Sequence, residues 1–93
     1  MKTRIAIHEV ENGDNWAKAW HKGEGGRHEQ FGKLGLKCRT FRDPKNPDSV
    51  AVIIEAEDFT EFENFLASDE GREAIAKDGV KMETLRFLSE FTD

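Results

Sequence analysis

Three histidines are the residues of this sequence best suited to acid and base chemistry. An unperturbed imidazole changes its charge close to neutral pH, so a histidine beside a substrate can accept or donate a proton. His8 lies where apolar and polar residues alternate, and His21 and His28 lie seven residues apart further along the chain. If the protein is an enzyme, we expect His8 and His28 to be its catalytic residues. The plainer alternative for each is a structural or solvent-exposed histidine.

His21, Glu24 and His28 are spaced so that an uninterrupted helix would place them roughly on one face. Two turns would separate the histidines by about 10 Å along the helix axis, which is too far for both to bind one ion. The three glycines of residues 23–26 also weaken the helix, by about 1 kcal/mol each relative to alanine. A solvated polar face is therefore favoured, and no metal site is predicted.

Aromatic residues form a second candidate group, suited to holding an apolar ligand. Trp16 and Trp20 are four residues apart, and Phe31 continues the helical spacing after the glycines. Such rings can pack against a sheet, or they can line a cleft and stack on a flat aromatic molecule. We predict that Trp16, Trp20 and Phe31 bind a small apolar or aromatic ligand. Ordinary core packing is the alternative.

The composition argues against several classes of function. The formal net charge is −5, whereas nucleic-acid binding needs clustered Lys and Arg to contact phosphates. Cys38 is the one cysteine and cannot form an internal disulfide, so a buried inert thiol and a cytoplasmic location are expected. No apolar stretch is long enough to cross a membrane, and the first residues lack a secretion pattern. We expect no nucleic-acid or membrane partner.

The apolar pattern predicts one domain over residues 1–93, with the order strand, helix, strand, strand, broken helix, strand. Strands are expected over 3–10, 36–42, 50–56 and 82–91. The first helix should begin at Asp14 as its N-cap and be kinked or split by the glycines, and the second should restart at Ser68 and end at residues 78–79. Pro44 and Pro47 predict a longer hairpin connection over residues 43–49.

This βαββαβ order is typical of ferredoxin-like α+β domains, in which two helical segments cover one face of a four-stranded antiparallel sheet. The opposite face should be polar if water covers it. Residues 50–56 are nearly all apolar, however, and Leu88 lies on the opposite side of its strand from Leu85 and Phe87. A second copy of the chain is the simplest cover for such a face, so we predict a homodimer.

The chain resembles the small proteins of the dimeric α/β-barrel superfamily over nearly its whole length. The resemblance rests on residues 7–10 before the tryptophan-containing helix, on 41–44 running into 50–55, and on 59–67 followed by 68–71. These segments are similar to a bacterial branch of mostly uncharacterised members, related to antibiotic-biosynthesis monooxygenases and cyclase-like proteins. The resemblance implies a cleft between the helices and the sheet, and it leaves the occupant open.

Members of this superfamily include cofactor-free monooxygenases, haem-binding enzymes, stress-responsive proteins and ligand-sensing modules. Haem-degrading members use an Asn, Trp and His set that does not map onto this chain, and no cofactor is expected. Three functions stay open from the sequence. The protein binds a small apolar or aromatic ligand, or it is a cofactor-independent monooxygenase or cyclase for an aromatic or polyketide-like substrate, or it is a structural or stress-related dimer.

Overall fold

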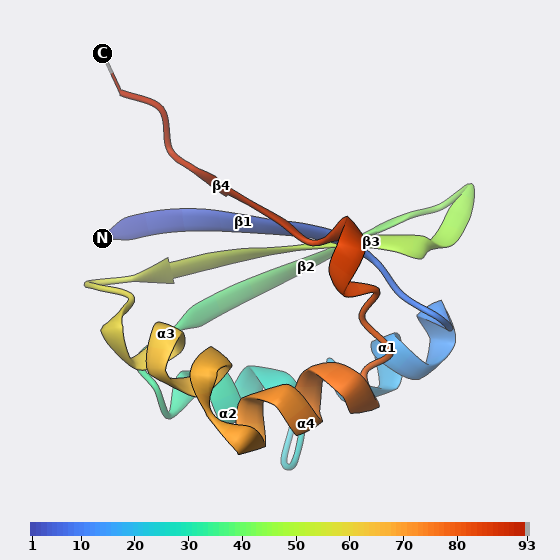
Figure 1. Cartoon of the computed structure of the whole chain (residues 1–93), viewed down its shortest axis with the longest axis horizontal. Coiled ribbons are helices and arrows are strands. Elements are labelled where there is room, and N and C mark those ends of the chain that lie inside the picture. Colours follow the sequence, from blue (N-terminus) through green and yellow to red (C-terminus); the bar gives the residue numbers. More distant parts are fainter. Residues whose placement is uncertain (93) are drawn as a thin grey trace.

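The computed structural model describes residues 1–92 as two layers, an antiparallel sheet and a set of helices that covers one of its faces (Figure 1). The strands are β1 (Lys2–Glu9), β2 (Lys37–Asp43), β3 (Asn46–Ala56) and β4 (Arg86–Ser89), in the spatial order β2-β3-β1-β4. The helices are α1 (Gly13–Ala19), α2 (Arg27–Gly32), α3 (Thr60–Ala67) and α4 (Asp69–Lys77), followed by the 3₁₀ turn η1 (Met82–Thr84). The predicted ferredoxin-like α+β fold is confirmed.

The sheet has a buried side under the helices and an open side away from them. In β1, Ala6 and His8 face the helices and are buried, whereas Ile5 and Ile7 face the open side. The same alternation in β3 buries four apolar residues, namely Val50, Val52, Ile54 and Ala56. The register places Ala6 opposite Val52 in one neighbouring strand and opposite Phe87 in the other. His8 therefore points into the space between the two layers.

Helix α1 begins earlier than the sequence predicted, because Asn12 and not Asp14 is its N-cap. The Asn12 side chain accepts hydrogen bonds from the backbone N–H groups of Asp14 and Asn15. Asp14 instead accepts a hydrogen bond from Arg42 at 2.8 Å and thereby links α1 to β2. The predicted split at the glycines is observed, since helix is absent between Ala19 and Arg27.

The hairpin connection is shorter than predicted. Strand β3 begins at Asn46, so the turn between β2 and β3 consists of residues 44–45 alone. The Asp43 carboxylate accepts from the Lys45 N–H, and the Arg42 guanidinium donates to the Pro47 carbonyl oxygen. Pro47 has no partner in either neighbouring strand, because β1 pairs with β3 only from Ser49 onward and the pairing with β2 shifts register between Asn46 and Val50. No ladder hydrogen bond therefore needs its missing N–H.

The last strand is also shorter than the predicted range of 82–91. Residues 82–84 form the turn η1, in which Thr84 donates its hydroxyl to the Lys81 carbonyl oxygen and accepts from the Glu9 N–H. The Glu9 N–H and the Lys81 carbonyl oxygen are therefore bonded to the Thr84 side chain and not to the backbone of a longer strand. Beyond Ser89 the chain leaves the sheet, and Phe91 is exposed (Figure 1).

Candidate ligand cavity

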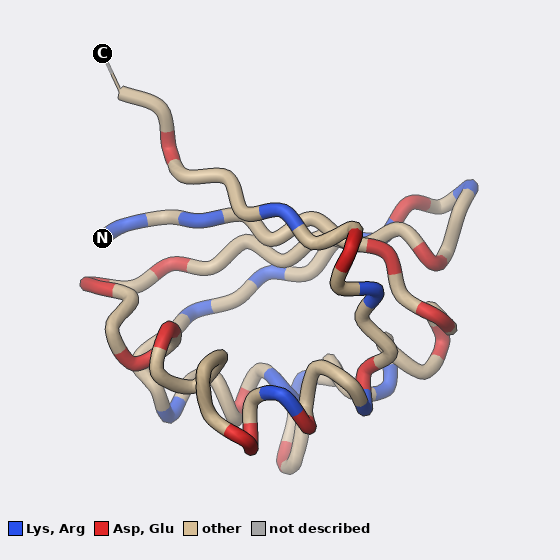
Figure 2. The backbone as a smooth tube through the Cα atoms, in the orientation of Figure 1, with Lys and Arg blue, Asp and Glu red and all other residues tan. Residues whose placement is uncertain are grey.

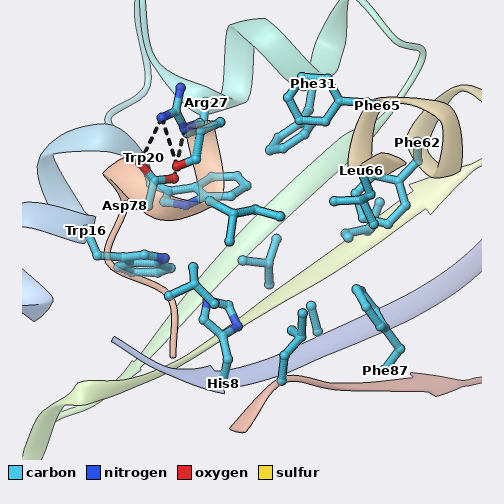
Figure 3. Close-up of a pocket in the computed structure, with 17 residues that line it drawn as sticks. His8, Trp16, Trp20, Arg27, Phe31, Phe62, Phe65, Leu66, Asp78 and Phe87 are labelled. Carbon is cyan, nitrogen blue, oxygen red and sulfur yellow. Dashed lines mark hydrogen bonds and ion pairs between the residues drawn. The ribbon is translucent and has the colours of Figure 1, made fainter. Parts of the chain in front are cut away.

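An apolar cavity of about 80 Å³ lies between the helices and the buried side of the sheet (Figure 3). Every helix and three of the four strands contribute to its lining. The side chains labelled in Figure 3 are His8, Trp16, Trp20, Arg27, Phe31, Phe62, Phe65, Leu66, Asp78 and Phe87. Phe87 is 43% exposed, so the lining reaches the surface beside β4.

His8 is the lining residue whose polar atoms lack hydrogen-bond partners. His8 is 5% exposed, and neither Nδ1 nor Nε2 makes a hydrogen bond with any residue of the described range 1–92. Its ring meets Trp16 edge-on, with the centroids 6.5 Å apart. Burial lowers the pKa of His8 below its ordinary value, although the Ala6 backbone and then the negative charge of Asp78 act in the opposite direction. Burial therefore favours the neutral form of the His8 imidazole over the charged form.

The three aromatic residues predicted to bind a ligand all line this cavity. The Trp20 ring is stacked on Phe31 at 5.4 Å between centroids and is tilted against Trp16 at 6.1 Å. Phe31 in turn meets Phe65 edge-on at 5.3 Å. Offset and edge-on contacts of this kind favour a fixed arrangement of rings. The cavity wall is therefore a connected aromatic cluster that α1, α2 and α3 hold together.

The two other histidines, His21 and His28, lie outside the cavity lining. The His28 ring packs edge-on against Trp20 at 5.3 Å, and its Nε2 atom is buried without a hydrogen-bond partner. Partial burial, followed by the nearby charge of Lys22, lowers the pKa of His28. His21 is exposed in the segment between α1 and α2. The structure brings His8 together with the tryptophans, and the catalytic role expected for His28 stays a prediction.

A buried ion pair at one end of the cavity joins α2 to the end of α4. Arg27 Nε donates to Asp78 Oδ2 and Nη2 donates to Oδ1, each at 2.8 Å (Figure 3). The side chains are 15% and 8% exposed, respectively. Arg27 also donates to the side-chain oxygen of Gln30 at 2.9 Å and to the Ala74 carbonyl oxygen at 3.5 Å. This two-bond geometry fixes both side chains.

The chain matches no protein-family model, and no curated protein is similar to it in sequence. Among solved structures, it resembles one described as the crystal structure of an antibiotic biosynthesis monooxygenase, with a TM-score of 0.69. The alignment covers 100% of this chain and 99% of that chain, at 15% sequence identity. This chain has the ferredoxin-like fold of that monooxygenase. The superfamily resemblance of the sequence is thereby confirmed at the level of fold, and an identity this low says nothing about activity.

Within this ferredoxin-like fold, Arg27 and Asp78 are the site residues that sequence reasoning missed. Arg27 does carry a local signal, because it lies seven residues after Trp20 and four before Phe31, in step with the aromatic stripe. Asp78 has no such signal in the sequence, since a polar residue before a glycine at a helix end is ordinarily exposed to solvent. Only the tertiary approach of α2 to α4 shows that they are partners.

Cys38 lies on the helix-facing side of β2 and is partly buried. Burial raises the pKa of its thiol to about 11, so the reactive thiolate is scarce at neutral pH. In the part of the chain that the structure describes, no three His, Cys, Asp or Glu residues are grouped so that they could hold a metal ion. No helix of the same residues is long and apolar enough to cross a membrane.

Proposed function

We propose that this protein binds a small apolar molecule in the cavity beneath its helices and that His8 forms the hydrogen bond that orients the molecule. The observation that carries the proposal is the buried His8 ring with both nitrogens unpaired. A buried polar group without a partner costs about 1–3 kcal/mol, and native structures leave few of them. A ligand hydroxyl or carbonyl beside His8 would remove this cost.

The cavity volume limits the size of the ligand. An apolar cavity of roughly 150 Å³ holds benzene in an engineered protein, whereas drug-sized ligands occupy about 300–1,000 Å³. The cavity here measures about 80 Å³ and reaches the surface beside Phe87. Its buried part is about half of the volume that holds benzene, so a single aromatic ring can enter it only in part, with the rest of the molecule at the surface. A ligand with several fused rings would require the helices to move.

The binding test uses Trp16 and Trp20 as built-in fluorescent reporters. Titration with single-ring aromatic compounds should change their emission in a saturable way and raise the melting temperature. Replacing Ala74, a partly buried lining residue, by leucine fills the cavity and should abolish the response. The matched replacement Ala19→Leu lies outside the lining and should retain it. Equal responses from both variants, or none from the unaltered chain, would disprove the proposal.

Proton abstraction by His8 is a second candidate function, which the neutral ring in an apolar cavity favours. A phenol bound beside His8 could transfer its O–H proton to an imidazole nitrogen and remain as the phenolate. Such a step would suit a cofactor-independent monooxygenase or cyclase, and the neighbour of similar fold is described as a monooxygenase. Replacing His8 by glutamine should then lower turnover by roughly 10²-fold or more, whereas His21→Gln, at an exposed position, should not. Unchanged turnover in His8→Gln would exclude the role.

We further propose that the protein is a homodimer formed through the open side of the sheet. Six apolar side chains occupy the middle of that side: Ile5, Ile7, Phe41, Ala51, Ile53 and Leu88. The register places five charged residues on the same side around them, namely Lys37, Arg39, Arg86, Glu9 and Glu55. Figure 2 shows basic and acidic positions distributed along the chain, the strands included. Two copies of such a face bury apolar area worth roughly 25 cal/mol per Å² and can pair opposite charges at the margin.

Sedimentation equilibrium at micromolar concentration decides the proposed assembly. The expected particle mass is twice the 10.6 kDa of one chain. A purely structural or stress-related dimer without a ligand is the remaining alternative, and a fully packed interior would favour it. The apolar cavity between the helices and the sheet supports ligand binding instead. A cytoplasmic location belongs to the same proposal, and fractionation of cells that express the protein tests it.

A further inference from the structure

We propose that Asp78 is the second polar contact of the cavity and that, with His8, it restricts the cavity to neutral ligands that carry a hydrogen-bond donor. The inference rests on the proposed ligand binding and adds the class of ligand. His8 lies in β1 and Asp78 directly follows α4, yet both line the same otherwise apolar cavity (Figure 3). The third polar residue of the lining is Arg27, which is engaged with Asp78.

Asp78 has hydrogen-bonding capacity that the described part of the chain does not use. An ionised carboxylate offers about four acceptor sites, and Arg27 occupies one on each oxygen. Because Asp78 is 6% exposed, bulk water has little access to the remaining sites. A ligand in the cavity that carries an O–H or N–H group can use them. A compound that only accepts hydrogen bonds cannot.

The charges around the cavity disfavour ionised ligands. Arg27 places four of its five N–H groups on Asp78, Gln30 and Ala74, so its guanidinium offers little to a ligand carboxylate. An anion would lie beside the Asp78 carboxylate and a neutral His8 ring, without a free cation. A cation would lose its hydration in an apolar cavity, and Arg27 already balances the Asp78 charge. A neutral ligand avoids both costs.

Three probes of similar size test separately whether the ligand must be neutral and whether it must carry a hydrogen-bond donor. Phenol is neutral and has a donor, anisole is neutral without a donor, and benzoate is an anion. We expect phenol to bind at least about tenfold more tightly than anisole and benzoate, which is the ratio of one net hydrogen bond to a charged acceptor. Tryptophan fluorescence gives the dissociation constants. The ¹³C resonance of the Asp78 side-chain carboxyl should shift on saturation with phenol, in the unaltered chain.

The role of Asp78 is tested by the double replacement Arg27→Met/Asp78→Leu, which exchanges the buried ion pair for apolar side chains. The ratio of phenol to anisole affinity should fall at least about threefold, because only His8 remains to pair with the hydroxyl. The same exchange in the exposed pair, Arg72→Met/Asp69→Leu, is the matched control and should keep the ratio. Thermal unfolding establishes that each variant is folded.

The outcomes separate this inference from the proposed function. If none of the three probes binds the unaltered chain, ligand binding and the role of Asp78 fail together. If all three bind with similar affinity, or the Asp78 carboxyl resonance does not respond to phenol, the cavity binds ligands and the inference alone is overturned. The ¹³C measurement decides the role of Asp78 even if the double replacement prevents folding.

Discussion

At the scale of single residues, His8 couples the stability of this protein to pH. Burial lowers its pKa from the ordinary 6.5, although the Ala6 backbone and the nearby Asp78 carboxylate, whose charge Arg27 balances, oppose this effect. The unfolded chain therefore binds a proton at pH values where the folded chain does not. The contribution of the neutral ring is fully present above about pH 6.5 and is lost as the pH falls toward the folded pKa. Each tenfold difference in proton affinity between the two states corresponds to about 1.4 kcal/mol.

We predict that replacing His8 by leucine reduces the loss of stability that accompanies a fall in pH. Urea unfolding at about pH 7.5 and about pH 5 should show a smaller fall in the free energy of unfolding for His8→Leu than for the unaltered chain. His21→Leu is the control, because that side chain is exposed. Both variants keep all carboxylates, so general acid effects cancel in the comparison. An identical fall in all three proteins would contradict the prediction.

The Arg27 and Asp78 pair should matter more for stability than any exposed ion pair of the described chain. Arg27→Gln leaves the Asp78 carboxylate buried without its counter-charge and should lower the free energy of unfolding by about 3 kcal/mol. Arg72→Gln removes the same group from a 3.7 Å pair whose side chains are 69% and 95% exposed. That change should cost less than about 1 kcal/mol. Chemical denaturation of the two variants side by side measures the contrast.

At the scale of elements, the junction of α3 and α4 depends on a glycine for steric reasons. A Cβ atom at Gly71 would overlap the Phe65 carbonyl oxygen, because the two helices meet almost directly at Ser68. A Cβ atom at Gly32, at the end of α2, would meet nothing within 4 Å. The same substitution should therefore have opposite effects at the two helical positions.

We predict that Gly71→Ala lowers the free energy of unfolding by about 2 kcal/mol or more, since backbone must move to relieve the overlap. Gly32→Ala should raise it by about 0.5–1 kcal/mol, because alanine restricts the unfolded chain and favours helix. Melting temperatures measured by circular dichroism report both changes. Should Gly71→Ala prove neutral, the close approach of α3 and α4 would be incorrect.

At the scale of the whole molecule, the open side of the sheet sets the expected response to concentration. If a second copy covers that side, the melting temperature must rise with protein concentration, because unfolding then includes dissociation. Leu88→Asp places a charge in the proposed interface, where the leucine is 45% exposed in one chain. We predict that this variant is monomeric and that its melting temperature no longer depends on concentration.

Met82→Asp is the matched control for the interface variant. Met82 is also apolar and is 56% exposed, but it lies in η1, outside the sheet. It should leave the particle mass and the concentration dependence unchanged. Light scattering after size-exclusion chromatography measures the mass. A dimer that survives Leu88→Asp, or dissociates equally in both variants, would show that the interface is not the open side of the sheet.

The sequence by itself determined the order of elements and the faces of the strands. Alternation in residues 3–10 and the apolar run of 50–56 depend on local periodicity, which a chain carries wherever it folds. The break between α1 and α2 also followed from composition. Boundaries were less predictable. Asn12 and not Asp14 caps α1, while the Asp14 carboxylate accepts from Arg42 of β2. The turn η1 shortens the last strand, where Thr84 accepts a hydrogen bond from the distant Glu9 N–H.

The aromatic half of the candidate site was likewise predictable, since Trp16, Trp20 and Phe31 share one helical spacing. The tertiary structure alone decided which histidine enters the cavity, because that depends on which side of β1 the helices cover. It alone also joined Arg27 to Asp78, 51 residues apart in sequence. Local pattern fixes the direction of a side chain relative to its own element, and only packing between elements fixes what that side chain meets.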